Sequence, residues 1–70
     1  MMSSEEFGRR IRKRRKEIGL NQAEVALASG TGVRFVSDLE NGKETCQLGK
    51  TLKVAANLGF ELDLKLKGKG

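Results

Sequence analysis

Residues 19–43, GLNQAEVALASGTGVRFVSDLENGK, decide the fold of this 70-residue chain. Asn21 is a good helix N-cap and Gly30 is a natural left-handed stop, so a helix of about eight residues is expected over 22–29. A second helix is expected over 33–41, because its apolar residues recur at helical spacing until an Asn-Gly pair. Those apolar residues are Val33, Val36 and Leu39. Periodicity alone does not distinguish such a pair from part of any small helical bundle.

Two further helices are expected to flank this segment. Ser3 and Glu6 have the spacing of a capping box, which predicts a helix over about 4–18 that ends at the following glycine. Its apolar positions are Phe7, Ile11 and Ile18. Thr45 is the expected N-cap of a fourth helix, and Gly59 is its C-terminal signal. The apolar face expected for the fourth helix consists of Leu48, Leu52, Ala55 and Leu58.

At the C-terminal end the pattern changes to strict alternation. Apolar and charged residues alternate over 60–67, which predicts a strand with one buried face. The apolar set is Phe60, Leu62, Leu64 and Leu66. No second strand-like segment exists in residues 1–59, so the strand is expected to pair with another molecule.

The charges of this strand favour one arrangement. Antiparallel pairing about a two-fold axis at Leu64 sets Glu61 opposite Lys67 of the other chain. The same axis sets Asp63 opposite Lys65, whereas parallel in-register pairing would place like charges side by side. We therefore expect a homodimer joined by a two-stranded antiparallel ribbon; the alternative is a frayed tail that happens to alternate. The expected organisation is a helical domain over 1–59, a dimerisation strand over 60–67 and a tail over 68–70.

Composition argues against several classes of protein. One cysteine and no histidine allow neither an intrachain disulfide nor an ordinary zinc site, and Cys46 is expected to pack at the start of the fourth helix. The sequence shows no carboxylate pair for a cleft and no phosphate-binding glycine loop, so neither catalysis nor a cofactor is expected. No apolar run approaches the roughly 20 residues of a membrane span, and no secretory signal is visible. A cytoplasmic protein without a membrane partner is the expectation.

Basic charge is concentrated in one segment. The formal net charge is +5, and seven of the fourteen basic residues lie between Arg9 and Lys16. The helix expected over 33–41 has one basic and two acidic residues, so its own charge cannot attract a polyanion. Three roles stay open for the basic segment: steering a nucleic acid, contacting an acidic partner protein, or forming a solvated face. A membrane-surface helix is disfavoured, because the few apolar residues there are needed in the core.

The segment over 19–43 resembles the helix-turn-helix of the Cro and phage-repressor (Xre) type. The resemblance lies in Gly19-Leu20-Asn21-Gln22, in Ala26 and Gly30 at the turn, and in Ser37-Asp38-Leu39-Glu40-Asn41-Gly42-Lys43. It implies an all-α, lambda-repressor-like domain of four to five short helices. The ending Leu58-Gly59-Phe60-Glu61-Leu62-Asp63-Leu64 is similar to the HipB-like branch, whose members dimerise through a C-terminal strand.

The resemblance implies a role for each matching residue. Gln22 matches a phosphate-binding glutamine at the start of the first short helix, and Asn41 and Lys43 match phosphate contacts after the second. Arg34, which can bind guanine bidentately, is the strongest expected base contact. The other residues expected to face DNA are Val33, Phe35, Ser37 and Asp38. Arg15 and Glu40 match a structural ion pair between the first and third helices.

Five of these residues have an alternative role. Val33 can contact a thymine methyl or pack in the core, and Phe35 can contact a thymine methyl or pack against the helix over 22–29. Ser37 can reach a phosphate or simply lie on the exposed side. Gln22 can be a simple polar residue of the first helical turn, and Lys43 can be a solvated loop lysine.

Gly32 departs from the family pattern, which commonly has Ser or Thr as the N-cap of the second helix. Glycine is weaker there by only roughly a few tenths of a kcal/mol, but it has no hydroxyl for a phosphate.

The implied function is that of a dimeric, sequence-specific repressor that places one helix in each of two major grooves of a palindromic operator. In the HipB-like branch the protein would be the antitoxin of a type II toxin–antitoxin pair, autoregulating its operon and binding a HipA-type kinase or another toxin. The alternatives are a stand-alone repressor without a toxin, and a mainly protein-binding antitoxin with weak DNA binding. The resemblance also implies a bacterial cytoplasmic protein associated with the nucleoid.

Overall fold

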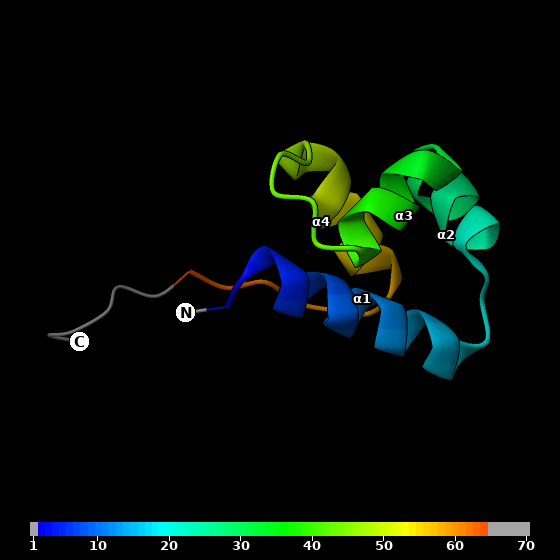
Figure 1. Ribbon diagram of the computed structural model, residues 1–70. Coiled ribbons are helices and arrows are strands. Elements are labelled where there is room, and N and C mark those ends of the chain that lie inside the picture. The colour runs from blue at the N-terminus through cyan, green and yellow to red at the C-terminus, as the bar shows by residue number, and fades with distance from the viewer. Residues whose placement is uncertain (1, 65–70) are drawn as a thin grey trace, which may run out of the picture.

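The computed structural model describes residues 2–64 and contains four α-helices in that range. They are α1 (Ser4–Ile18), α2 (Gln22–Ser29), α3 (Val33–Glu40) and α4 (Leu48–Asn57). α1 lies along one side of the domain, and α2, α3 and α4 pack together on its other side (Figure 1). The expected all-helical domain is confirmed, and the two short helices lie where the sequence pattern placed them, with α3 ending at Glu40.

Both ends of α2 are specified locally. Asn21 Oδ1 accepts a hydrogen bond from Glu24 N at 2.8 Å, and Glu24 Oε1 accepts one from Asn21 N at 2.8 Å, which completes a capping box. Gly30 ends the helix with φ +69°, a left-handed conformation that glycine adopts without a steric penalty. The direction in which the chain enters α3 is therefore set by residues within and next to α2.

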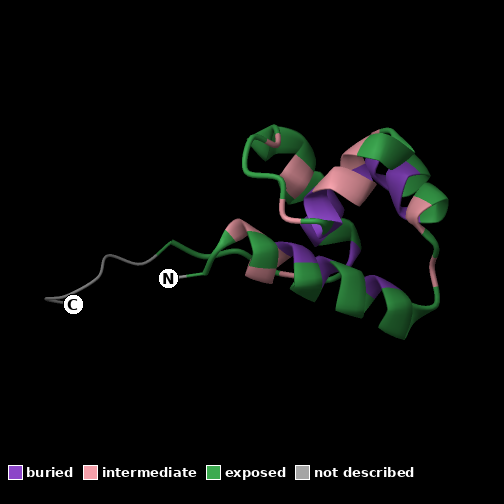
Figure 2. Ribbon diagram, in the orientation of Figure 1, coloured by how far each residue is buried: buried purple, intermediate pink, exposed green. Residues whose placement is uncertain are grey.

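The core lies between α1 and the other three helices (Figure 2). It consists of Ile11, Val25, Ala26, Val36, Leu39, Val54, Ala55 and Leu58, each at most 4% exposed. Partly buried side chains that pack against it are Phe7, Leu20, Phe35, Cys46 and Phe60. Because α1, α2, α3 and α4 all contribute to this cluster, the position of α3 is held by the whole domain.

The N-cap expected for α4 is wrong. Thr45 lies in a turn at residues 44–45, and the helix begins only at Leu48, with Gln47 as its N-cap. Gln47 makes no side-chain cap; its carbonyl instead accepts hydrogen bonds from the amide and the hydroxyl of Thr51. The turn therefore lengthens the loop after α3.

The apolar face expected for α4 is only half correct. Ala55 and Leu58 are buried together with Val54, but Leu48 is 69% exposed and Leu52 is 41% exposed. The end of α4 packs on α2, where Asn57 Nδ2 donates a hydrogen bond to Ser29 Oγ at 3.2 Å, whereas its first turn extends beyond the core. Ile18, in the last turn of α1, is also exposed.

The strand expected over 60–67 does not form within the described residues. Residues 60–64 have no regular secondary structure, and Leu66 lies outside the described part of the chain. Phe60 packs against the core, but Leu62 is 55% exposed and Leu64 is 99% exposed. A strand requires backbone hydrogen bonds to a neighbouring strand, and residues 2–64 of one copy offer none. The ribbon between two copies therefore remains a proposal.

The contact between α1 and α3 depends on a glycine that the sequence pattern did not single out. Gly8 is buried, and a Cβ added to it would lie 2.6 Å from the carbonyl oxygen of Glu40 and closer still to that of Leu39. Neither neighbour is a flexible side chain that could move aside. The first helix therefore approaches the end of α3 this closely only because residue 8 has no side chain.

Gly8→Ala is expected to destabilise the domain by roughly 1–3 kcal/mol, the usual cost of over-packing a rigid contact. For a domain of this size, that corresponds to a melting temperature lower by about 5 °C or more, measured by circular dichroism. Gly49→Ala in α4 is the matched control, because a Cβ there meets nothing within 4 Å. The control should be as stable as the native protein or slightly more stable. Equal stability of the two variants would contradict the close approach.

Candidate nucleic-acid interface

Three charged side chains meet on the outer face of α3. The Arg34 side chain is 93% exposed, and its Nε lies 3.9 Å from Asp38 Oδ2, one helical turn further on. Lys43 Nζ, from the loop after α3, lies 3.5 Å from the same oxygen. Exposed ion pairs of this length contribute little to stability. Both cations can therefore exchange the Asp38 carboxylate for a phosphate or a base edge at little cost.

The start of α3 offers backbone donors in place of a capping side chain. Gly32 is the N-cap and makes no side-chain cap. The amides of Phe35 and Val36 donate to the Gly32 carbonyl, so the amides of the first two helical residues have no partner within the helix. Val33, the first of them, is 47% exposed and is not part of the core. A hydrogen-bond acceptor can approach this end of α3 closely. Gly32 has no side chain, and no other atom lies within 4 Å of the position that its Cβ would occupy.

The remaining α3 residues expected to face DNA differ in exposure. Phe35 is partly buried against the core, and Lys50 Nζ of α4 lies 5.9 Å from its ring centroid. Ser37 is partly buried, and its carbonyl accepts a hydrogen bond from Asn41 N at 3.0 Å. Asn41 is exposed at the C-cap of α3. Phe35 therefore has a packing contact, whereas Asn41 is open to solvent.

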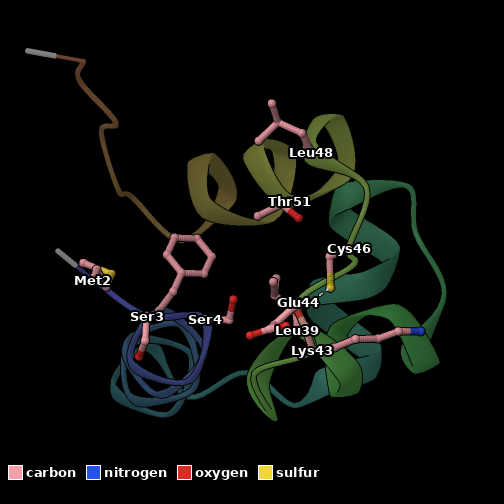
Figure 3. A pocket seen from close by; sticks show the side chains of 10 residues that line it. Met2, Ser3, Ser4, Leu39, Lys43, Glu44, Cys46, Leu48 and Thr51 are labelled. Atoms are coloured by element: carbon pink, nitrogen blue, oxygen red, sulfur yellow. Dashed lines mark hydrogen bonds between the residues drawn. The ribbon is translucent and has the colours of Figure 1, made fainter.

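A hollow of about 280 Å³ lies between the start of α1, the loop after α3 and the start of α4 (Figure 3). Cys46 lines it with the expected packing role, and its Sγ lies 3.4 Å from Lys43 O. The other lining side chains are Met2, Ser3, Ser4, Phe7, Leu39, Lys43, Glu44, Leu48 and Thr51. No group of three potential metal-binding side chains occurs among residues 2–64. We assign this hollow a structural role, because the loop that carries Lys43 forms part of its lining.

Beneath the interface, a buried ion pair joins α1 to α3. Arg15 Nε donates to Glu40 Oε2 at 2.6 Å, and Arg15 Nη2 donates to Glu40 Oε1 at 3.1 Å, with the two side chains 9% and 2% exposed. This is the ion pair that the resemblance implied. Arg15 Nη1 also donates to the Leu20 carbonyl at 2.9 Å, just before α2. The pair therefore ties the ends of three helices together.

Gln22 belongs to the same network, which the sequence pattern did not show. Its Nε2 donates to Glu40 Oε1 at 3.0 Å, and a primary amide has a second N–H that remains free for another acceptor. The backbone amides of Gln22 and Ala23 have no acceptor within the helix. The side chain and the carbonyl of Asn21 accept instead from the amides of Glu24 and Val25. The start of α2 thus directs several donors, and the positive end of the helix dipole, toward one place next to Glu40.

The network determines the ionisation of its two charged members. Burial alone would raise the pKa of Glu40, but hydrogen bonds from Arg15 and Gln22, with the charges of Arg15 and Arg12, lower it below the ordinary value of 4.5. The hydrogen bonds that Arg15 donates to Glu40 raise the pKa of Arg15 and outweigh burial, which would lower it. Both groups are therefore charged at neutral pH.

Acid is expected to destabilise the domain through Glu40. Because its pKa is lower in the folded than in the unfolded state, its contribution is complete above the unfolded value of 4.5 and is lost as the pH falls through the folded value. Glu40→Gln should be less stable than the native protein at neutral pH, and the difference should shrink as the pH falls below 4.5. Urea unfolding at a series of pH values measures this; a constant difference would refute it.

The basic residues of α1 divide into two groups. Three have partners: Arg10 pairs with Glu6 at 3.1 Å, Arg14 Nε donates to the Leu58 carbonyl at 2.9 Å, and Arg15 binds Glu40. The Arg14 contact holds the end of α4 and was not anticipated. The other four are exposed and have no ion-pair partner among residues 2–64: Arg9, Arg12, Lys13 and Lys16. Within the same range, no helix has the length and apolar character to cross a membrane.

Comparison with known proteins relates this geometry to a family. Residues 11–64 match the helix-turn-helix family model. The chain is 44% identical over 63 residues to the uncharacterized HTH-type transcriptional regulator y4mF of Sinorhizobium fredii (strain NBRC 101917 / NGR234), across 90% of this chain and 83% of that protein.

Solved structures share the fold. The restriction-modification controller protein C.AhdI from Aeromonas hydrophila matches with a TM-score of 0.75 at 34% identity, over 83% of this chain and 88% of that chain. A chain of the HipA–HipB–O2–O3 complex matches with a TM-score of 0.84 at 21% identity, over 96% of this chain and 94% of that chain. These matches confirm the resemblance found in residues 19–43, and the chain belongs to the Xre-type helix-turn-helix family of transcriptional regulators.

Proposed function

We propose that this protein is a dimeric repressor that reads a palindromic DNA operator with α3. The outer face of α3 carries the proposal, because Arg34 is 93% exposed there and is bound only by a weak ion pair to Asp38. An arginine on such a face can donate two hydrogen bonds to O6 and N7 of guanine, which discriminates against other bases by about 1–3 kcal/mol. Val33, 47% exposed at the start of α3, can contact the methyl group of a neighbouring thymine.

Phosphate contacts would fix the position of α3 in the groove without reading sequence. The donors at the start of α2 lie beside the end of α3, because Gln22 is hydrogen-bonded to Glu40. Asn41 and Lys43 lie directly after α3 in the next loop. Phosphates of the DNA backbone could accept hydrogen bonds from the free amide hydrogen of Gln22 and from Lys43. Phe35 and Ser37, both partly buried, would make secondary contacts.

The long-range attraction to DNA cannot come from α3, because its one basic residue, Arg34, is outnumbered by two acidic residues, Asp38 and Glu40. It would come from the unpaired basic residues of α1, namely Arg9, Arg12, Lys13 and Lys16, whose field steers encounter. Their exposure supports this role over a purely structural one. Steering by exposed charges is screened by salt, so the association rate should fall as the ionic strength rises.

A palindromic operator requires two copies related by a two-fold axis. Leu62 and Leu64 support dimerisation, because a single copy leaves them 55% and 99% exposed. The proposed ribbon over residues 60–67 pairs antiparallel about Leu64. Such a dimer would present its two α3 helices to major grooves about one helical turn, roughly 34 Å, apart.

A second candidate role is that of an antitoxin. The match to a chain of the HipA–HipB–O2–O3 complex favours a HipA-type partner, whereas C.AhdI, a controller protein at higher identity, favours a stand-alone regulator. Purification with the product of the adjacent gene decides between them. Stable co-purification with a kinase-like or ribonuclease-like protein would support the antitoxin role, and purification alone would support the stand-alone repressor.

The direct test is equilibrium binding to DNA from upstream of the protein's own gene. We expect a site bound at least about 10³-fold more tightly than unrelated duplex at the same salt concentration. Equal affinity for both duplexes would refute sequence-specific repression.

A further inference from the structure

One carboxylate of α3, that of Asp38, contacts both cations of the outer face. Its Oδ2 lies 3.9 Å from Arg34 Nε and 3.5 Å from Lys43 Nζ. We propose that Asp38 is a specificity-determining residue. It holds Arg34 and Lys43 away from the phosphates of unrelated DNA, and it releases them where a cytosine offers its amino group to the carboxylate. The inference rests on the proposed function and deepens it.

The stability of α3 does not account for a carboxylate at this position. Asp38 is the third residue from the end of α3, where the helix dipole disfavours negative charge. Glu40, the other carboxylate of this last turn, is compensated by its buried pair with Arg15. Asp38 has only its two weak surface pairs within residues 2–64. Its presence on this face therefore calls for a role other than holding the helix.

The backbone places both cations beside this carboxylate. Arg34 precedes Asp38 by four residues, so the two side chains lie on one face of the helix. The amide of Lys43 donates a hydrogen bond to the Asp38 carbonyl at 3.0 Å, which folds the loop back onto α3. In the free protein Asp38 therefore supplies the negative charge that a phosphate would otherwise bring to these two cations.

The surroundings of Asp38 favour this role over that of a freely solvated side chain. The side chain is 30% exposed and lines a hollow of about 190 Å³ between α3, the following loop and the start of α4. Lys43 and Lys50 line the same hollow. Salt screens partly buried charges less than fully exposed ones. The carboxylate therefore faces positive charge from the loop and from α4 as well as from α3.

Unrelated DNA and an operator differ in what they offer Asp38. A phosphate repels the carboxylate, so contacts with the backbone alone must draw Arg34 and Lys43 away from it. A cytosine in the major groove presents its N4 amino group, which a carboxylate accepts. One turn of α3 rises about 5.4 Å and base pairs are about 3.4 Å apart, so Asp38 would meet a pair one or two steps from the guanine of Arg34. A base then satisfies the carboxylate, and both cations are free for DNA.

Asp38→Asn tests the hold on the cations, because asparagine keeps the size of the side chain and removes its charge. Affinity for an unrelated duplex should rise by roughly 10-fold or more, since each subunit of the dimer loses two weak ion pairs. The slope of log affinity against log salt concentration should steepen by about 1 for each cation released to a phosphate. Glu44→Gln is the matched control, because it removes an exposed carboxylate of the same loop that has no ion-pair partner in the described range. Equal effects of the two variants would overturn the inference.

Base preference is a second readout, which overall charge does not move. On operator duplexes in which each base pair is changed in turn, the native protein should discriminate at a G·C pair close to the one read by Arg34. Asp38→Asn should lose the preference for cytosine there and favour adenine, whose N6 and N7 an asparagine binds. The ratio of operator affinity to unrelated-duplex affinity should fall by at least about 10-fold, whereas Glu44→Gln should leave it unchanged. The same base preference in Asp38→Asn as in the native protein would overturn the inference.

The melting temperature separates this role from a structural one. Asp38→Asn should be as stable as the native protein or slightly more stable, because the last turn of α3 loses an unfavourable charge. A melting temperature lower by more than about 5 °C, measured by circular dichroism, would overturn the inference. Equal affinity of the native protein for operator and unrelated duplex would count against the proposed function. Tighter binding of Asp38→Asn than of Glu44→Gln to unrelated duplex would even then support the hold of Asp38 on its cations.

Discussion

Glu40→Ala is expected to remove most of the stability of the domain. The substitution removes the acceptor of two hydrogen bonds from Arg15 and one from Gln22, and it leaves a guanidinium that is only 9% exposed without its counter-charge. Loss of one partner of a buried ion pair costs about 3–5 kcal/mol. Natural domains are stable by only about 5–15 kcal/mol, and a domain this small is expected near the lower end. Urea unfolding at neutral pH measures the loss.

Two comparisons separate this effect from a general loss of charge. Glu17→Ala removes a surface carboxylate that is 51% exposed and 3.7 Å from Arg14, and should change stability by no more than about 0.5 kcal/mol. Replacing both partners, as Arg15→Met with Glu40→Leu, should restore much of the stability, because no unpaired charge is then buried. A Glu40→Ala variant as stable as Glu17→Ala would show that the network does not hold α1, α2 and α3 together.

Arg34→Ala is expected to weaken specific operator binding strongly without affecting the fold. Its side chain is 93% exposed, so truncation removes no core contact. Loss of one bidentate guanine contact costs about 1–3 kcal/mol per half-site, and a palindrome contains two half-sites. The dimer should therefore lose about 2–6 kcal/mol, a factor of roughly 30 to 10⁴ in affinity for the operator, measured by fluorescence anisotropy.

The control for Arg34→Ala is Lys53→Ala, which removes one exposed positive charge from α4. It should weaken binding to operator and to unrelated duplex by the same small factor, because it acts only through the overall field. Arg34→Lys keeps the positive charge but loses the bidentate hydrogen-bond donor, so its specificity for the operator should resemble that of the alanine variant. Unchanged operator affinity of Arg34→Ala would contradict the proposal that α3 reads the bases of the operator.

The positions of the two short helices could be predicted because their signals are local. Asn21, Glu24 and Gly30 specify the ends of α2 through contacts within a few residues. The pairing of Arg15 with Glu40 came from the family resemblance, since no local pattern connects residues 25 positions apart. The face of α4 was mispredicted because Leu48 and Leu52 fit a helical stripe equally well, and only packing against α2 decides which turn is covered.

Other features could not be predicted because they depend on two elements meeting in space. Gly8 has no pattern of its own; its absent side chain matters only because α3 ends against it. The hydrogen bonds of Gln22 to Glu40 and of Arg14 to the Leu58 carbonyl likewise join segments that are far apart in the sequence. The C-terminal alternation specifies a strand only in the presence of a partner, so one copy of the chain cannot display it.

Hydroxyl-radical footprinting of the native protein on DNA from upstream of its own gene tests the central claim most directly. A dimer that reads DNA with two α3 helices should protect two sequence-related half-sites on one face of the duplex, about 10 base pairs apart and related by two-fold symmetry. Repetition at two salt concentrations reports how many phosphates are engaged. A single unsymmetrical protected stretch, or uniform protection independent of sequence, would contradict the account.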